Sequence, residues 1–222
     1  MPTQMEYARQ GRITEAMAYV AEVEGVSPEE IREKVAAGVV VIPANPNHRT
    51  LTRFTGIGKG LSVKVNANLG TSYDYVNLEE ELEKLRLAVE AGADAVMDLS
   101  TGGDLQAIRQ AILDHCPVPL GTVPIYEAEF EAARKRGSFF DMTVDDLFET
   151  IERHGREGVD FITVHCGVTR HALERYIRTD RVTGIVSRGG GLMAAWMLHN
   201  DAENPLYQYY DCLLYTSDAA DE

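Results

Sequence analysis

Short apolar runs recur along the chain, and each run ends at a polar or reactive residue. Their length and their β-branched residues predict strands, and stretches with helical periodicity fill the gaps between them. The runs cover residues 63–68, 95–100, 120–126, 161–165 and 183–188. Repetition of strand, loop, helix and loop predicts an α/β fold, either a barrel or a doubly wound sheet.

Helical patterns precede and separate these runs. Residues 13–37 predict two short helices, and the second begins at Ser27, with Pro28 in its first helical position. Further amphipathic or capped segments predict helices over residues 78–91, 104–115, 127–136, 144–157 and 190–199. Because helices alternate with the predicted strands, the arrangement is a series of βα units.

The number of βα units bears on the architecture. A closed barrel of this type has eight strands and about 250 residues, whereas this chain has 222 residues and five such strands in series. We therefore predict an incomplete (β/α)8 TIM-type barrel of about five βα units, preceded by a short helical N-terminal segment. In this interpretation the lead-in covers residues 1–62, the partial barrel covers residues 63–211, and the chain is incomplete at its C-terminus.

Residues 212–222 differ in character from the rest. Their sequence resembles the in-frame translation of a sequencing adapter, so we interpret them as a non-native tail outside the fold. The alternative is a natural acidic tail. On the first interpretation Cys212 has no chemical role.

Charge and cysteine content limit the classes of partner and compartment. The formal charge of −14 argues against nucleic acid and against an acidic membrane surface, although it allows a small basic pocket for a phosphate. Three sparse cysteines indicate a reducing compartment rather than a disulfide framework. The N-terminus lacks the pattern of a signal peptide, and no apolar run is long enough to span a bilayer. We therefore predict a soluble, cytoplasmic protein without a membrane partner.

The ends of the runs are the candidate site, because ligands in both α/β architectures bind at the carboxyl ends of the strands. Asn68 ends a run whose polar and apolar residues alternate, which favours a nearby ligand; the alternative is an edge strand with a solvated face. His165 ends a run of buried character and is either a ligand-binding residue or a satisfied core histidine. Tyr126 either contacts a ligand or packs as an ordinary aromatic residue.

The segment Ser187-Arg188-Gly189 is the best candidate for a phosphate site. It precedes a predicted helix, whose N-terminus has free N–H groups, and Arg188 adds a bidentate donor. The alternative is an ordinary glycine-rich turn. Lys64 is the only lysine in a predicted barrel strand, so an aldolase-like Schiff base also stays open.

Six longer blocks carry a resemblance to a known family. They cover residues 3–5, 42–45, 65–70, 96–102, 117–126 and 183–190, and include Val65-Asn66-Ala67-Asn68-Leu69-Gly70 and Val96-Met97-Asp98-Leu99-Ser100-Thr101-Gly102. These blocks resemble the phosphomethylpyrimidine synthase (ThiC) family, which acts in thiamine biosynthesis. The resemblance extends over residues 3–211.

The resemblance implies a radical S-adenosylmethionine enzyme. Such an enzyme rearranges 5-aminoimidazole ribotide to hydroxymethylpyrimidine phosphate, using S-adenosylmethionine, a 4Fe–4S cluster and a second metal, zinc. The implied fold is a (β/α)8 barrel whose cluster-bearing C-terminal segment reaches the partner's barrel in a homodimer. The implied contacts to the ribotide are Asn68, Met97, Tyr126, His165, Ser187, Arg188 and Gly189.

Some motifs of the family do not occur in this sequence. They are an Asp-Gly-Leu-Arg block, two metal-binding histidines and a Cys-x-x-Cys-x4-Cys cluster motif. We therefore expect no metal ligands in this chain and no catalysis by this chain alone. The alternatives are a non-catalytic ribotide- or phosphate-binding half-barrel, and a phosphate-binding barrel of the aldolase type that reacts through Lys64.

Overall fold

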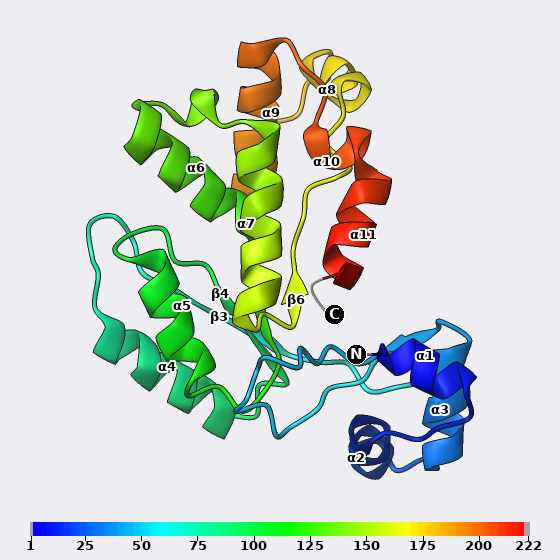
Figure 1. The fold of residues 1–222 in the computed structure, drawn as a ribbon. Coiled ribbons are helices and arrows are strands. Elements are labelled where there is room, and N and C mark those ends of the chain that lie inside the picture. The colour runs from blue at the N-terminus through cyan, green and yellow to red at the C-terminus, as the bar shows by residue number, and fades with distance from the viewer. Residues whose placement is uncertain (1, 220–222) are drawn as a thin grey trace. The chain divides into compact units, whose positions relative to one another are not determined.

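The computed structural model describes residues 2–219, which form a mixed α/β chain with a parallel sheet (Figure 1). The chain divides into two compact units, which are described separately below. The first unit contains residues 2–122 and 155–161, and the second contains residues 123–154 and 162–219. Among these described residues, no helix has both the length and the apolar character needed to cross a bilayer.

Three short helices begin the first unit: α1 (Gln4–Arg9), α2 (Glu15–Glu24) and α3 (Pro28–Ala36). The sequence predicted α2 and α3, and Ser27 caps α3 by accepting a hydrogen bond from the Glu30 backbone N–H at 3.2 Å. It did not predict α1, although Thr3 and Glu6 form a reciprocal capping box at the start of that helix. Hydroxyl side chains therefore begin each of the three helices.

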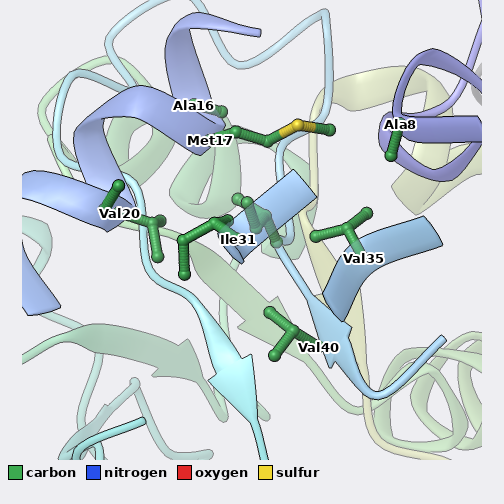
Figure 2. Packing of buried hydrophobic residues seen from close by; sticks show 9 residues of the cluster. Ala8, Ala16, Met17, Val20, Ile31, Val35 and Val40 are labelled. Atoms are coloured by element: carbon green, nitrogen blue, oxygen red, sulfur yellow. The ribbon is translucent and has the colours of Figure 1, made fainter. Parts of the chain in front are cut away.

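These helices share an apolar core with the short strand that follows them (Figure 2). Strand β1 (Val40–Val41) pairs in antiparallel fashion with β2 (Ile57–Gly58). Glycine is required in β2, because a Cβ on Gly58 would lie 2.2 Å from the carbonyl oxygen of Val39. The core residues are Ala8, Ala16, Met17, Val20, Ala21, Ile31, Val35, Val40 and Ile42.

The main sheet has four strands in the order β3-β4-β5-β6. They are β3 (Asn66–Leu69), β4 (Ala95–Asp98), β5 (Leu120–Thr122) and β6 (Phe161–Ile162). The pairs β3–β4 and β4–β5 are parallel, so the connections between them need crossovers, and helices supply these. Helices α4 (Leu78–Glu90) and α5 (Leu105–Leu113) lie side by side next to β3 and β4 (Figure 1). The predicted α/β class with a parallel sheet is confirmed, and the partial barrel stays a prediction.

An apolar cluster joins the sheet to these two helices. Val96 and Leu120 from the strands are fully buried, as is Ile112 from α5, and Leu85 of α4 is nearly so. Burial of a side chain of this size contributes about 1.5–3 kcal/mol. The alternation of strands and amphipathic helices in the sequence therefore corresponds to a real βαβ core.

The predicted fifth strand is wrong. Residues 183–187 have no strand assignment, and helix α9 (Arg188–Asn200) begins directly after them. A strand is stable only when a neighbouring strand pairs with its backbone, and residues 183–187 lie outside both sheets of the described chain. Val182 and Val186 are accordingly exposed instead of buried. Their apolar, β-branched character was the misleading signal.

A buried network of hydrogen bonds connects β5 to the segment before β6 in the first unit. The carboxylate of Asp160 accepts hydrogen bonds from the backbone N–H groups of Asn45 at 2.8 Å and Leu120 at 2.7 Å. The two ring nitrogens of His48 lie 2.6 Å from Asp160 Oδ2 and 2.9 Å from the carbonyl oxygen of Cys116. The buried His48 ring therefore bridges two acceptor oxygens, one on Asp160 and one on Cys116.

The second unit is helical in its described residues. It contains α6 (Pro124–Arg136), the 3₁₀ turn η1 (Phe139–Asp141), the larger part of α7 (Val144–Glu157), α8 (Arg170–Ile177), α9, α10 (Pro205–Gln208) and α11 (Tyr210–Ala219). The sequence did not predict α8, α10 or α11. Helix α11 includes most of the predicted non-native tail, whose last residues, 220–222, lie outside the described residues. The origin of that tail stays a prediction.

Charged side chains link α6 to α7. Glu127 lies 2.8 Å from the Nε2 atom of His154 and accepts a hydrogen bond from Arg153 at 2.7 Å. Glu131, one turn further along α6, accepts a second bond from Arg153 at 3.3 Å. Glu127 and His154 are almost fully buried. These acidic residues of α6 therefore serve the contact with α7.

Candidate functional site

The start of α9 presents free backbone N–H groups and a positive side chain. Ser187 caps the helix, because its Oγ accepts a hydrogen bond from the Gly190 N–H at 3.2 Å. Arg188 and Gly189 occupy the first helical positions, where backbone N–H groups have no partner within the helix. The helix dipole adds partial positive charge at this end, so the arrangement suits an anion such as a phosphate.

His165 lies directly against this helix start. Its Nε2 atom is 2.8 Å from the Ser187 Oγ, and an added Cβ on Gly189 would lie only 2.3 Å from the Cε1 atom of the imidazole. Glycine is therefore needed at position 189 for the ring to occupy its place. The sequence predicted His165 and the Ser187-Arg188-Gly189 segment as separate candidates, and the structure places His165 against this segment.

The contact with Ser187 is compatible with a neutral His165 that carries its proton on Nδ1. Ser187 Oγ accepts from Gly190 and can donate its own hydrogen to His165 Nε2, and in that arrangement the ring proton lies on Nδ1. Burial lowers the pKa of His165, which favours this neutral form. The Nδ1 atom is buried and has no hydrogen-bond partner among the described residues. It is a donor that a bound ligand could satisfy.

The guanidinium of Arg188 contacts two side chains of α6. Its central carbon lies 4.9 Å from the ring centroid of Tyr126, a cation–π distance. Its Nη2 atom lies 3.7 Å from the Oε2 atom of Glu129. Burial raises the pKa of Glu129, and the positive charge of Arg188 opposes that shift. The sequence analysis named Arg188 and Tyr126 but missed Glu129.

Tyr126 was expected at the mouth of the third strand, and this placement is wrong. Strand β5 ends at Thr122, and Tyr126 lies in the first turn of α6. Pro124 is the physical reason, because it has no N–H for the sheet and its fixed backbone angle suits the first turn of a helix. The sequence therefore identified Tyr126 as a candidate but assigned it to a strand, whereas it lies on a helix.

The sheet holds the two remaining candidates. Asn68 of β3 and Met97 of β4 are direct partners in the parallel register, so their side chains lie on the same face. Asn68 Oδ1 accepts a hydrogen bond from the Asn66 amide at 3.0 Å, and the Asn68 side chain is exposed. Asn68 and Met97 therefore occupy adjacent positions on one face of the sheet.

Asp98 is a further residue at this strand end that the sequence analysis did not select. It is 6% exposed and accepts a hydrogen bond from the Ser100 N–H at 2.9 Å. Burial raises the pKa of Asp98, although the bonds from Ser100 and the positive charge of Arg109 oppose this shift. The signal was present, since a carboxylate directly ended a buried apolar run.

Lys64 has a structural role that does not favour a Schiff base. It precedes β3, and its Nζ lies 2.6 Å from Oε1 of Glu24 at the end of α2. Burial alone would raise the pKa of Glu24, but the hydrogen bonds from Lys64 and Ser62 outweigh it and lower that pKa. An ammonium held in an ion pair is not a nucleophile.

The described residues do not fit a metal or an iron–sulfur cluster. Nowhere in residues 2–219 do three histidine, cysteine, aspartate or glutamate side chains come together as a ligand set. Burial raises the pKa of the Cys116 thiol to about 12 and raises that of Cys166 as well, whereas cluster ligands are thiolates. Cys212 is exposed. The predicted 4Fe–4S cluster and zinc therefore have no ligand set in this part of the chain.

The parallel sheet of the first unit defines an α/β protein, and the polar cluster at the start of α9 in the second unit has the features of an anion-binding site. The model of the radical SAM ThiC family matches residues 3–221. The chain therefore belongs to the radical SAM ThiC family, as the sequence blocks predicted.

The names of similar proteins agree with this family. This chain is similar to three proteins that are named phosphomethylpyrimidine synthase. The relative from Thermus thermophilus is 71% identical over 96% of this chain and 48% of its own length. The relatives from Desulforamulus reducens and Moorella thermoacetica are 58% and 56% identical, each over 96% of this chain and 49% of its own length. The chain spans about half the length of the curated relatives that it matches.

Proposed function

We propose that this chain is the ribotide-holding part of a phosphomethylpyrimidine synthase of thiamine biosynthesis. The whole enzyme would convert 5-aminoimidazole ribotide to hydroxymethylpyrimidine phosphate and would act as a homodimer in the cytoplasm. Family membership and the names of the relatives support the proposal. The observation that carries it for this chain is the cluster of His165, Ser187, Arg188 and Gly189 at the start of α9.

Each residue of the cluster has a role that its contacts support. The free N–H groups of Arg188 and Gly189, with the guanidinium and the Ser187 hydroxyl, would hold the ribotide phosphate. The Nδ1–H of His165 would donate a hydrogen bond to the ribose or the imidazole ring. Tyr126 would line the site as an aromatic wall, since it already lies against Arg188.

Asn68 and Met97 belong to the same proposed set of ribotide contacts. Their support is the register that places them on one face at the end of the sheet. Asn68 would supply an amide hydrogen bond, and Met97 would supply an adaptable apolar surface. Their contact with the same substrate molecule is part of the proposal.

The cofactors belong to the whole enzyme. When bound, S-adenosylmethionine with a 4Fe–4S cluster supplies a 5′-deoxyadenosyl radical. The described residues offer no ligand set for that cluster or for zinc, so we place both groups on parts of the enzyme outside this sequence. The 222 residues alone should bind no cluster and turn over no substrate; a stoichiometric cluster spectrum after anaerobic reconstitution would contradict this.

Calorimetric titration of the purified chain with aminoimidazole ribotide tests the binding role. Arg188→Ala should weaken binding by about 10- to 100-fold, because it removes a charge-assisted bidentate hydrogen-bond donor. Arg181→Ala is the matched control, since Arg181 lies in the same segment and is exposed. Equal affinity of the two variants would show that Arg188 does not hold the phosphate.

A chimeric enzyme tests the catalytic part of the proposal. Residues 1–211 would replace the matching part of the Thermus thermophilus relative, which is 71% identical. With S-adenosylmethionine and a reductant under anaerobic conditions, the chimera should form hydroxymethylpyrimidine phosphate. Lack of product from a chimera with a complete cluster, beside an active parent enzyme, would favour the non-catalytic binding role instead.

A further inference from the structure

Glu129 is a buried carboxylate that no step above uses. Its side chain is 13% exposed and lies on α6 three positions after Tyr126, so both residues face the Arg188 guanidinium. The Oε2 atom is buried and makes no hydrogen bond to any described residue. It lies 3.7 Å from Arg188 Nη2, so the two charges attract each other, but this distance is too long for a hydrogen bond.

The other acidic residues on this part of α6 serve a different contact. Glu127 and Glu131 bond Arg153 of α7, and Glu127 also bonds His154. Among the described residues, the charged side chain that Glu129 faces is Arg188, which is 45% exposed and can meet a ligand. The contact with α7 therefore does not explain why a carboxylate stands at position 129.

We propose that Glu129 sets the anion affinity of the site by competing with the bound anion for the Arg188 guanidinium. The proposal rests on the proposed function, because it requires that Arg188 holds the ribotide phosphate. Without ligand, Glu129 and Tyr126 keep the guanidinium against α6. A phosphate offers Arg188 short, charge-assisted hydrogen bonds that Glu129 does not make, and so it displaces the carboxylate.

A bound dianion also changes the electrostatic balance of Glu129. The anion neutralises Arg188 and brings like charge close to a buried carboxylate, which favours uptake of a proton by that carboxylate. Burial already shifts the pKa of Glu129 upward. The other titratable group at the helix start is His165, which packs on Gly189 and hydrogen-bonds Ser187. Anion affinity should therefore fall as Glu129 ionises with rising pH.

Sulfate is the probe for this test, because it stays a dianion throughout the range used. The purified chain would be titrated with sodium sulfate at pH 5 and pH 8 by calorimetry. At pH 8, Glu129→Gln should bind sulfate about fivefold more tightly than the wild type, because a nearby like charge is gone. At pH 5 the two affinities should converge. Glu131→Gln, with the same change of charge on the same helix, should match the wild type.

Proton uptake gives a second readout that a change of packing would not produce. Titrations in two buffers of different ionisation enthalpy measure the protons taken up when sulfate binds. The wild type should take up more protons than Glu129→Gln, and the difference belongs to Glu129 because His165 is present in both proteins. Circular dichroism would confirm that both variants are folded.

The outcomes separate this proposal from the proposed function. Sulfate and ribotide binding by the wild type, with equal or weaker sulfate binding by Glu129→Gln at pH 8, would overturn the competing role of Glu129 alone. Absence of both sulfate and ribotide binding by the wild type would overturn the proposed function together with this inference.

Discussion

Backbone pairing holds the candidate residues on the sheet, whereas contacts between side chains hold those at the start of α9. Asn68 and Met97 lie opposite each other because β3 and β4 are in register along four residue pairs. The imidazole of His165, by contrast, is placed by its hydrogen bond to Ser187 and by the space that Gly189 leaves for it. The first arrangement tolerates changes of side chain, and the second depends on the identity of particular residues.

The variant with the largest expected effect tests the buried network that supports the sheet. Asp160→Ala should lower the free energy of unfolding by about 3–5 kcal/mol, because it leaves the buried His48 ring and two buried backbone N–H groups without their partner. Urea denaturation followed by circular dichroism measures the change. Asp74→Ala is the control, since Asp74 is exposed. A loss below about 1 kcal/mol for Asp160→Ala would show that the network is not needed.

A variant with an intermediate expected effect tests the side-chain contacts at the start of α9. Gly189→Ala places a methyl group 2.3 Å from Cε1 of His165, so we expect a loss of about 1–3 kcal/mol in unfolding free energy and at least tenfold weaker ribotide binding.

Gly191→Ala is the matched control on the same helix. No heavy atom lies within 4 Å of a Cβ at that position, so better helix propensity should stabilise the protein by up to about 1 kcal/mol. Equal behaviour of the two variants in thermal denaturation would show that His165 does not restrict position 189.

The smallest effect sharpens the comparison, because it tests a side chain of the sheet that lies beside Met97. Burial raises the pKa of Asp98 in the folded state above its unfolded value. Between those two values the folded state binds more protons, so stability falls as pH rises through this window. Asp98→Asn should remove that loss of stability. At pH values above the window, its free energy of unfolding should exceed that of the wild type by an amount on the order of 1 kcal/mol.

Denaturation midpoints of wild type and Asp98→Asn at several pH values check this sign. The advantage of the variant should grow from acidic to neutral pH, and Asp74→Asn should show no such trend. A wild type that becomes more stable than Asp98→Asn as pH rises would mean that Arg109 and Ser100 outweigh the burial of the carboxylate.

Much of the sheet was predictable because local pattern and tertiary structure agree there. The predicted runs at 95–100 and 161–165 contain β4 and β6 near their starts, and the amphipathic pattern from Leu78 gave α4 nearly in full. In these segments burial, strand propensity and helix capping all favour the same structure.

The remainder depended on contacts between residues distant in sequence. Residues 183–188 have the composition of a strand, but a strand needs a pairing partner, which composition does not reveal. Glu129 was missed because an acidic residue in a helix rich in charged residues resembles a solvated one. Its burial against Arg188 follows only from the fold. Tyr126 was assigned to a strand although Pro124 indicated a helix start, a local signal that was overlooked.

The nine-residue apolar core of α1–α3 and β1 also bears on the order of events during translation. All its members lie between Ala8 and Ile42, so this core can form soon after that segment leaves the ribosome. The main sheet instead needs strands from Asn66 to Ile162, which at about 5–20 residues per second takes roughly 5–20 s to synthesise. During that interval the first strands have no complete sheet to join, and the nascent chain then depends most on chaperones.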